Sequence, residues 1–199
     1  MSLNQPTIIK WGNLKIGDDT LIFNMTSSFD CPSRKLGLCK ILNNGITCYA
    51  EKPEKMYKYT LSYRQRQEKF WDTTSAEKIA DYFTEQIKHR KKPTRYFRFN
   101  ESGDFKSQQD VIKLSKIANE LNKINVITYG YTSRRDLNFE SINFIIKGSG
   151  FSAPGLNGST TVVKKNELIP DEYISCIGDC KICNLCKFKN NINIAFKKH

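Results

Sequence analysis

The residues best suited to chemistry in this chain are its seven cysteines, which fall into two groups. One group lies near the N-terminus and the other near the C-terminus, in a chain with only two histidines. The C-terminal group follows the pattern C-x3-C-x2-C-x2-C, and repeated x2 spacing lets successive thiolates converge on one inorganic core. The candidate metal ligands are Cys31, Cys39, Cys48, Cys176, Cys180, Cys183 and Cys186.

Spacing favours iron over zinc in the C-terminal group. Structural zinc usually takes its ligands as two C-x2-C pairs from distant turns, and this run has no such division. Its last three cysteines resemble the ferredoxin triplet that binds one cubane, so an iron–sulfur cluster is the first interpretation and zinc the second. Cys176 could belong to either group. Seven ligands for two 4Fe–4S clusters leave one iron without a thiolate, open to a substrate or cofactor.

Other roles for the thiols are less favoured. A disulfide framework prefers an even cysteine count in a short secreted chain, whereas this chain has an odd count, 199 residues and no apolar leader in residues 1–10. Burial as a small hydrophobe is a real alternative for Cys39 alone, but the polar residues among the C-terminal four argue against it there. We expect His89 and His199 to be solvated rather than ligating.

Composition indicates a folded protein with a basic surface. Hydrophobic residues make up 39% and aromatic residues 12% of the chain, and no apolar stretch reaches the ~20 residues that cross a bilayer. We therefore expect a cytoplasmic protein with no membrane partner and reduced thiols. The net charge of +12 raises nucleic acid as a partner. The densest basic runs, residues 88–92 and 196–199, are more typical of solvated surface.

The elements expected to position these residues alternate between strands and helices. Apolar patterns and capping residues predict strands at 7–9, 20–24, 96–99, 124–129 and 142–146, and helices at 54–71, 74–87, 107–121 and 136–140. This alternation predicts parallel βαβ units, hence an α/β fold, either a partial parallel barrel or a layered βα sheet. We expect an α/β domain over residues 1–170 and a Cys-rich, cluster-binding tail over 171–199 packed on it.

Three polar, glycine-containing loops should meet at the carboxyl ends of the strands, where ligands collect in such folds. They follow Phe99, Tyr129 and Ile146. Arg134 and Arg135, in the second loop, could hold a carboxylate or phosphate there or merely solvate the rim. The candidate ligand-binding residues of the other two loops are Glu101, Gly103, Asp104, Gly148 and Gly150.

Several segments together resemble the phage gene product 88 family. They are Cys31-Pro32, Cys39, Cys48-Tyr49-Ala50, residues 98–105 (RFNESGDF), residues 129–132 and the terminal cysteine run, spread over residues 25–190. That family is similar to compact radical S-adenosylmethionine enzymes, in which a partial α/β barrel holds a 4Fe–4S cluster on three cysteines. This chain departs from their C-x3-C-x2-C spacing, because seven and eight residues separate its first three cysteines.

The resemblance implies roles for specific residues. Cys31, Cys39 and Cys48 would bind one cluster, residues 101–104 including Ser102 would hold the amino group of S-adenosylmethionine, and the loop with Gly148 and Gly150 would flank its adenosyl part. The implied protein is an iron–sulfur protein of the host cell cytoplasm, with a radical or other redox activity and an electron donor or host protein as partner. The alternative is a zinc-stabilised module that binds nucleic acid through its basic surface.

Overall fold

The structure is a computed structural model that describes residues 8–39 and 48–197. The strands are β1 (Lys10–Asn13), β2 (Gly17–Phe23), β3 (Tyr96–Phe99), β4 (Ile127–Thr132), β5 (Ile145–Ser149), β6 (Ser159–Val163), β7 (Tyr173–Ser175) and β8 (Asn193–Lys197). The helices are α1 (Pro32–Lys35), α3 (Glu51–Met56), α4 (Thr60–Thr73), α5 (Ala76–Lys88) and α6 (Gln108–Asn122). No described helix is long and apolar enough to cross a membrane.

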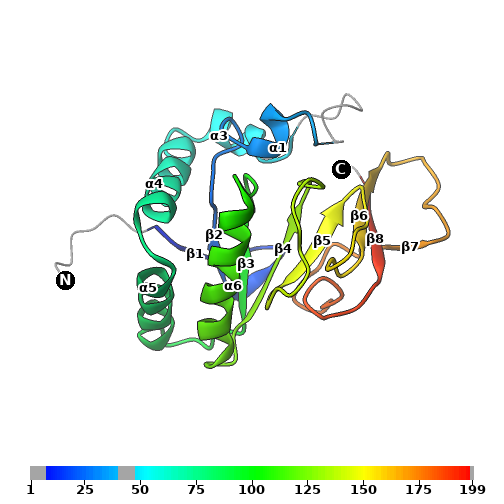
Figure 1. Ribbon diagram of the computed structural model, residues 1–199. Coiled ribbons are helices and arrows are strands. Elements are labelled where there is room, and N and C mark those ends of the chain that lie inside the picture. The colour runs from blue at the N-terminus through cyan, green and yellow to red at the C-terminus, as the bar shows by residue number, and fades with distance from the viewer. Residues whose placement is uncertain (1–7, 40–47, 198–199) are drawn as a thin grey trace.

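The strands form one open sheet in the order β1-β2-β3-β4-β5-β6-β8-β7. Only the β1–β2 hairpin is antiparallel, and the pairs from β2 to β7 are parallel. The α/β prediction with parallel strands is therefore confirmed, and the sheet does not close into a barrel. The C-terminal segment contributes strands β7 and β8 to one edge of this sheet, and the residues between these two strands pack on one of its faces (Figure 1).

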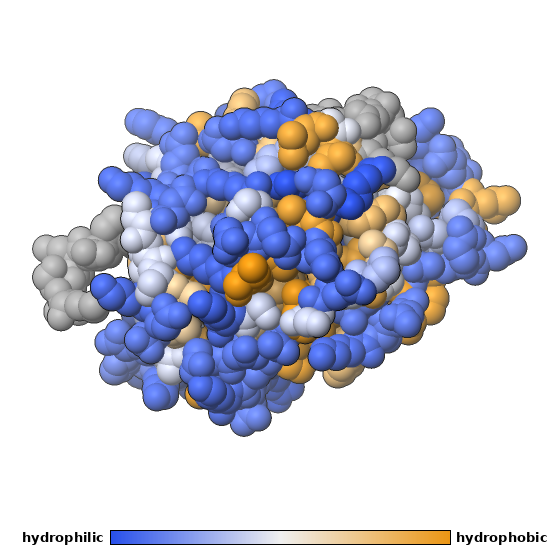
Figure 2. Space-filling model, in the orientation of Figure 1, coloured by the Kyte–Doolittle hydropathy of each residue, from blue (hydrophilic) through white to orange (hydrophobic). Residues whose placement is uncertain are grey.

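Helices α4, α5 and α6 cover one face of the sheet (Figure 1). Each of α5 and α6 carries apolar residues at helical spacing, and these pack on the odd-numbered residues of β2 and β3. Phe83 of α5 lies between Phe23 and Phe97, with ring centroids 5.3 and 5.0 Å away. The outer surface of these helices is largely hydrophilic, whereas hydrophobic residues gather to the right of α6 (Figure 2).

Within residues 8–39 and 48–197, the opposite face of the sheet carries no helix, and the cysteine-rich segment 176–192 covers it instead (Figure 1). Tyr96 and Tyr129 form a small buried cluster there with Ile145. The buried Lys187 places its ammonium 4.0 Å from the centroid of the Tyr96 ring. The two faces of the sheet therefore differ. One packs an aromatic and aliphatic core against helices, and the other carries tyrosines and is covered by the cysteine-rich segment.

Several predicted elements are confirmed. The strand at 96–99 has the predicted bounds, and α5 and α6 match their predictions within a few residues. The Ser75 side chain caps α5 by accepting a hydrogen bond from the Lys78 amide, as the capping pattern indicates. The strand predicted at 20–24 is the second half of β2.

Other predictions were wrong, and local backbone geometry explains most of them. The short helix at 136–140 is absent, because Asn138 bonds its neighbours and Gln108 in turns. Asn125 and Ser141 adopt positive φ angles of 59° and 61°, so the chain turns there and β4 and β5 begin about three residues later than predicted. The single helix at 54–71 is two helices, since Tyr57 is extended (φ −113°, ψ 112°).

The first predicted strand was also misplaced. Residues 8 and 9 are not in a strand, which begins only at Lys10, and residue 7 lies outside the described residues. In the third predicted loop, Lys147 and Gly148 belong to β5 instead.

Candidate functional site

The N-terminal cysteine group lies at the carboxyl end of β2. Cys31 precedes α1, Cys39 follows it, and Cys48 leads into α3; all three are partly buried. The Cys48 thiol is within electrostatic range of both Cys31 and Cys39. Burial, together with the carboxyl of Asp104, raises the pKa of Cys31 to about 12, and burial also raises the pKa of Cys48. These two thiols are therefore protonated at neutral pH unless a metal displaces the proton.

Asp104 fixes this cysteine loop to the sheet. Its carboxylate is buried and accepts hydrogen bonds from the Ser33 and Thr132 hydroxyls, each at 2.7 Å. It also accepts bonds from the amides of Ser133 at 2.7 Å and Phe105 at 2.9 Å. Since Ser33 lies in α1 and Thr132 ends β4, one side chain ties the segment after Cys31 to the third strand of the parallel array.

A second buried hydrogen-bond network, centred on Glu54 of α3, joins the same 101–104 loop to the segments around the first cysteine group. The Glu54 carboxylate pairs with Arg64 at 2.5 Å and accepts bonds from the amide and hydroxyl of Ser28 at 2.8 and 2.5 Å. The Ser102 hydroxyl donates to the same carboxylate at 3.3 Å. Sequence analysis missed this network, because residues 28, 54, 64 and 102 share no local pattern.

The C-terminal cysteine group lies against the helix-free face. Cys176, Cys180, Cys183 and Cys186 are all partly buried. Cys176 and Cys180 interact electrostatically, and Cys186 interacts with both of them. The structure thus places Cys176 near its sequence neighbours, which the spacing alone left open. The Tyr131 hydroxyl at the end of β4 forms a hydrogen bond with Cys186.

Four cations surround this second group. Lys15, Arg98 and Lys187 act electrostatically on Cys180, and Lys147 acts on Cys186. The Lys187 ammonium donates to the carbonyl of Cys180 at 3.0 Å, and the Cys180 amide donates to the carbonyl of Lys15 at 3.0 Å. The fully buried Lys147 bonds the carbonyl of Ile192 at 2.8 Å. The C-terminal group is therefore electropositive, whereas a buried carboxyl borders the N-terminal group.

The donor chemistry of both groups suits a metal held by thiolates. Each group offers sulfur alone, gathered on partly buried loops, and such donor sets bind iron–sulfur clusters or zinc. Over residues 8–39 and 48–197, however, no group of three or more Cys, His, Asp or Glu side chains is arranged as a site that could hold a metal ion. Ligation therefore requires rearrangement of the thiols within each group.

The loop predicted to hold S-adenosylmethionine is engaged within the protein. The Glu101 carboxylate accepts bonds from Asn13 at 2.9 Å and Lys10 at 3.3 Å. Asp104 and Ser102 bond the partners described above. Gly103 (φ 80°) packs on Thr26, where a Cβ would lie 2.0 Å from the hydroxyl oxygen. These residues shape the edge of the sheet around the first cysteine group.

The two glycines of the other predicted binding loop behave differently. A Cβ on Gly148 would meet the carbonyl oxygen of Phe151 at 2.1 Å, so this glycine permits a tight turn of the chain on itself. Gly150 adopts a φ of 76° just beyond β5. Arg134 and Arg135, also considered for anion binding, donate hydrogen bonds to backbone carbonyl oxygens instead. Arg134 donates to the carbonyls of Phe105 and Lys106, and Arg135 donates to the carbonyl of Leu38 at 2.9 Å.

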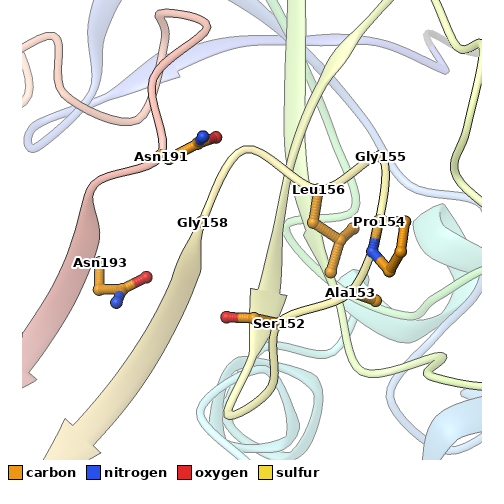
Figure 3. A pocket seen from close by; sticks show the side chains of 8 residues that line it. All are labelled: Ser152, Ala153, Pro154, Gly155, Leu156, Gly158, Asn191 and Asn193. Atoms are coloured by element: carbon orange, nitrogen blue, oxygen red, sulfur yellow. The ribbon is translucent and has the colours of Figure 1, made fainter.

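A surface groove of about 500 Å³ lies apart from both cysteine groups. The loop 152–156 forms one side, and Asn191 and Asn193 lie across from it before and in β8 (Figure 3). No cysteine lines this groove, and its polar groups are two amides, one hydroxyl and backbone. It offers no thiol, and no titratable group that could activate its hydroxyl, so the cysteine groups are the better candidate site.

Comparison with known proteins gives one match. The family model described as gene product 88 matches residues 3–146, which include Cys31, Cys39, Cys48 and the 101–104 loop. The match ends before the C-terminal cysteine group. No curated protein and no solved structure matches the chain.

Proposed function

The chain belongs to the gene product 88 family, and from this starting point we propose that it is a phage iron–sulfur protein with a 4Fe–4S cluster in each cysteine group. One observation carries the proposal: seven partly buried cysteines lie in two groups at one sheet, three near its carboxyl edge and four on its helix-free face, and the thiols of each group would have to draw together to bind a cluster. Thiolate is the ligand that iron–sulfur clusters require, and four thiolates close a cubane.

The unequal ligand numbers assign different roles to the two groups. Cys176, Cys180, Cys183 and Cys186 would close one cluster, which suits electron transfer. Cys31, Cys39 and Cys48 would leave one iron open. Such clusters supply one-electron chemistry, and an open iron adds a position for a substrate or cofactor.

The residues around the C-terminal group support a cluster by their charge. Lys15, Arg98, Lys147 and Lys187 offset the negative charge that four thiolates bring. The Tyr131 hydroxyl, hydrogen-bonded to Cys186, would orient that sulfur. At the other group, Asp104 acts as a positioning residue, because it holds Ser33 two residues from Cys31.

We further propose that the protein is related in architecture to radical S-adenosylmethionine enzymes. The support is a parallel sheet with helices on one face and a three-cysteine loop at its carboxyl edge. Binding of S-adenosylmethionine by the 101–104 loop would require its internal bonds to Asn13, Lys10 and Glu54 to be exchanged for bonds to the ligand. Dithionite reduction with S-adenosylmethionine should then release 5'-deoxyadenosine. Intact clusters without this product would restrict the protein to electron transfer or another redox reaction.

Metal partition between two sets of variants tests the central proposal. Replacing Cys31, Cys39 and Cys48 by Ser should remove about half of the iron and sulfide from protein purified without oxygen, and replacing the other four should remove the remaining half. Lys189→Ala, at an exposed position in the same segment as the second group, is the matched control and should keep the full wild-type content of iron and sulfide.

The competing function is a zinc-stabilised module that binds nucleic acid. Stoichiometric zinc without iron, together with salt-dependent binding of DNA or RNA, would replace the iron–sulfur proposal by this one. The predicted basic run 88–92 is partly engaged within the protein, because Arg90 stacks 4.3 Å from the Trp11 ring and Lys92 pairs with Asp18 at 2.6 Å.

A further inference from the structure

Arg98 presents an unusual feature: a half-buried guanidinium with one nitrogen shielded from solvent and without an acceptor. Its Nε is shielded from solvent and has no hydrogen-bond partner, and no described residue accepts a bond from its other two nitrogens. Arg64 and Arg134, the two buried arginines, each bond several carbonyl or carboxylate oxygens. A guanidinium offers five donors, and leaving the Nε–H of Arg98 unpaired away from water is costly.

The sheet holds Arg98 in this position. Arg98 lies in the central strand β3, paired with Ile22 of β2 on one side and Tyr129 of β4 on the other. Its side chain points to the helix-free face, where the guanidinium lies 5.4 Å from the centroid of the Tyr131 ring. That contact satisfies the π face of the guanidinium but none of its in-plane N–H donors.

The nearby carboxylate does not serve as its partner. Glu101 interacts with Arg98 electrostatically, but its two oxygens accept bonds from Asn13 and Lys10. The remaining neighbours are tyrosines: Tyr49, Tyr129 and Tyr131 all interact with Arg98. Burial raises the pKa of Tyr129 and Tyr131, so both hydroxyls stay neutral, and the Tyr129 hydroxyl can donate alongside the guanidinium.

Arg98 also lies between the two cysteine groups. It acts electrostatically on Cys180 of the C-terminal group and on Tyr49, which follows Cys48 of the N-terminal group. A ligand held by Arg98 would therefore border both groups.

We infer that Arg98, on the helix-free face of the sheet, binds an oxyanion, a carboxylate or phosphate group of a small-molecule ligand. A planar guanidinium with free in-plane donors matches such a group in two parallel hydrogen bonds. The inference does not depend on iron, because it concerns an unpaired cation of the chain itself.

Thermal unfolding of the anaerobically purified protein tests this inference. The melting temperature is measured in sodium phosphate and in sodium acetate, each against sodium chloride of equal ionic strength. A ligand that binds only the folded state raises the melting temperature saturably. We expect phosphate, acetate or both to do so, and the more effective anion distinguishes a phosphate ligand from a carboxylate one. No rise with either anion overturns the inference.

Arg98→Met and Arg95→Gln sharpen the test. Arg98→Met removes the guanidinium donors, so its response to both anions should be lost. Arg95→Gln, at an exposed position immediately before the same strand, should keep the wild-type response. An Arg98→Met protein that still responds to the anions contradicts the inference.

Arg98→Lys covers the case in which the methionine variant does not fold. Lysine keeps the charge but loses the paired in-plane donors, so the anion concentration needed for half the shift should rise about tenfold or more. An unchanged half-point contradicts the inference. Iron and zinc content are measured on the same samples, so a protein that binds oxyanions but no iron refutes the iron–sulfur proposal alone.

Discussion

The Lys187 ammonium donates a hydrogen bond to the carbonyl oxygen of Cys180 at 3.0 Å, seven residues back along the chain. This bond closes the loop that carries Cys180, Cys183 and Cys186, and the same ammonium covers the Tyr96 ring of the sheet. Lys187 is only 3% exposed, although the residues beside it, Phe188 and Lys189, are exposed. A single buried lysine thus both closes the cysteine loop and holds it against the helix-free face.

Lys187→Ala should therefore destabilise the protein. It removes a charged hydrogen bond and the packing of the lysine stem, so we expect the free energy of unfolding to fall by about 2–3 kcal/mol. Denaturant unfolding measures this change. Lys189→Ala, the exposed control, should change it by less than about 0.5 kcal/mol. Equal effects of the two substitutions would show that Lys187 does not hold the loop.

Asp104→Asn should loosen the first cysteine loop. The amide group of asparagine would face donors on Ser33, Thr132 and two backbone amides, so we expect a loss of about 2–3 kcal/mol of stability. In metal-free protein, alkylation of Cys31 should accelerate, as followed by mass spectrometry. Asp171→Asn, at an exposed position, serves as the control. An unchanged alkylation rate of Cys31 in the Asp104 variant would show that this carboxylate does not hold the cysteine loop.

Phe83→Ala should disrupt the core under the helices. Phe83 is fully buried between Phe23 and Phe97, and truncation of such a side chain usually lowers the free energy of unfolding by about 3–5 kcal/mol. Phe188→Ala removes a ring that is half exposed and should have a much smaller effect. A loss below 1 kcal/mol at Phe83 would mean that α5 is not packed on the sheet as described.

The Arg134–Asp136 pair predicts a dependence of stability on pH. The hydrogen bond from Arg134 lowers the pKa of Asp136, so the stabilisation is present above the unfolded-state pKa of about 3.9 and is lost as pH falls through the lower folded-state pKa. We expect the melting temperature to fall as pH drops below about 4. Asp136→Asn should reduce this slope, whereas Gln65→Ala, at an exposed and uncharged position of α4, should not. Identical slopes in all three proteins would contradict this assignment.

Sequence patterns predicted the helices and strands whose ends and buried faces are determined by residues within the same segment. The Ser75 cap and the apolar spacing of Ile79 and Phe83 define α5 within the chain segment itself. Strand ends depended instead on single residues with positive φ, Asn125 and Ser141, which are neither glycine nor part of a recognisable turn motif. The helix–strand pattern therefore fixed the α/β class but not the bounds of β4 and β5.

Of the candidate site, the sequence indicated the cysteines and the 101–104 loop. Their types and spacing are local, whereas the residues that surround them come from distant parts of the chain. Lys147 directly follows the apolar pattern of residues 142–146 and resembles a loop residue in sequence, yet it lies in β5 and is fully buried with three acceptors. Arg98 shows no special feature until β3 is placed between β2 and β4. Long-range pairing of this kind leaves no periodicity in the sequence.

The most direct test of the account is the iron and acid-labile sulfide content of the wild-type protein purified without oxygen, with its visible spectrum. Two 4Fe–4S clusters predict about eight iron and eight sulfide per chain and a brown protein that bleaches on reduction. A colourless protein with zinc in place of iron, or with seven freely titrating thiols and no metal, would contradict the central claim.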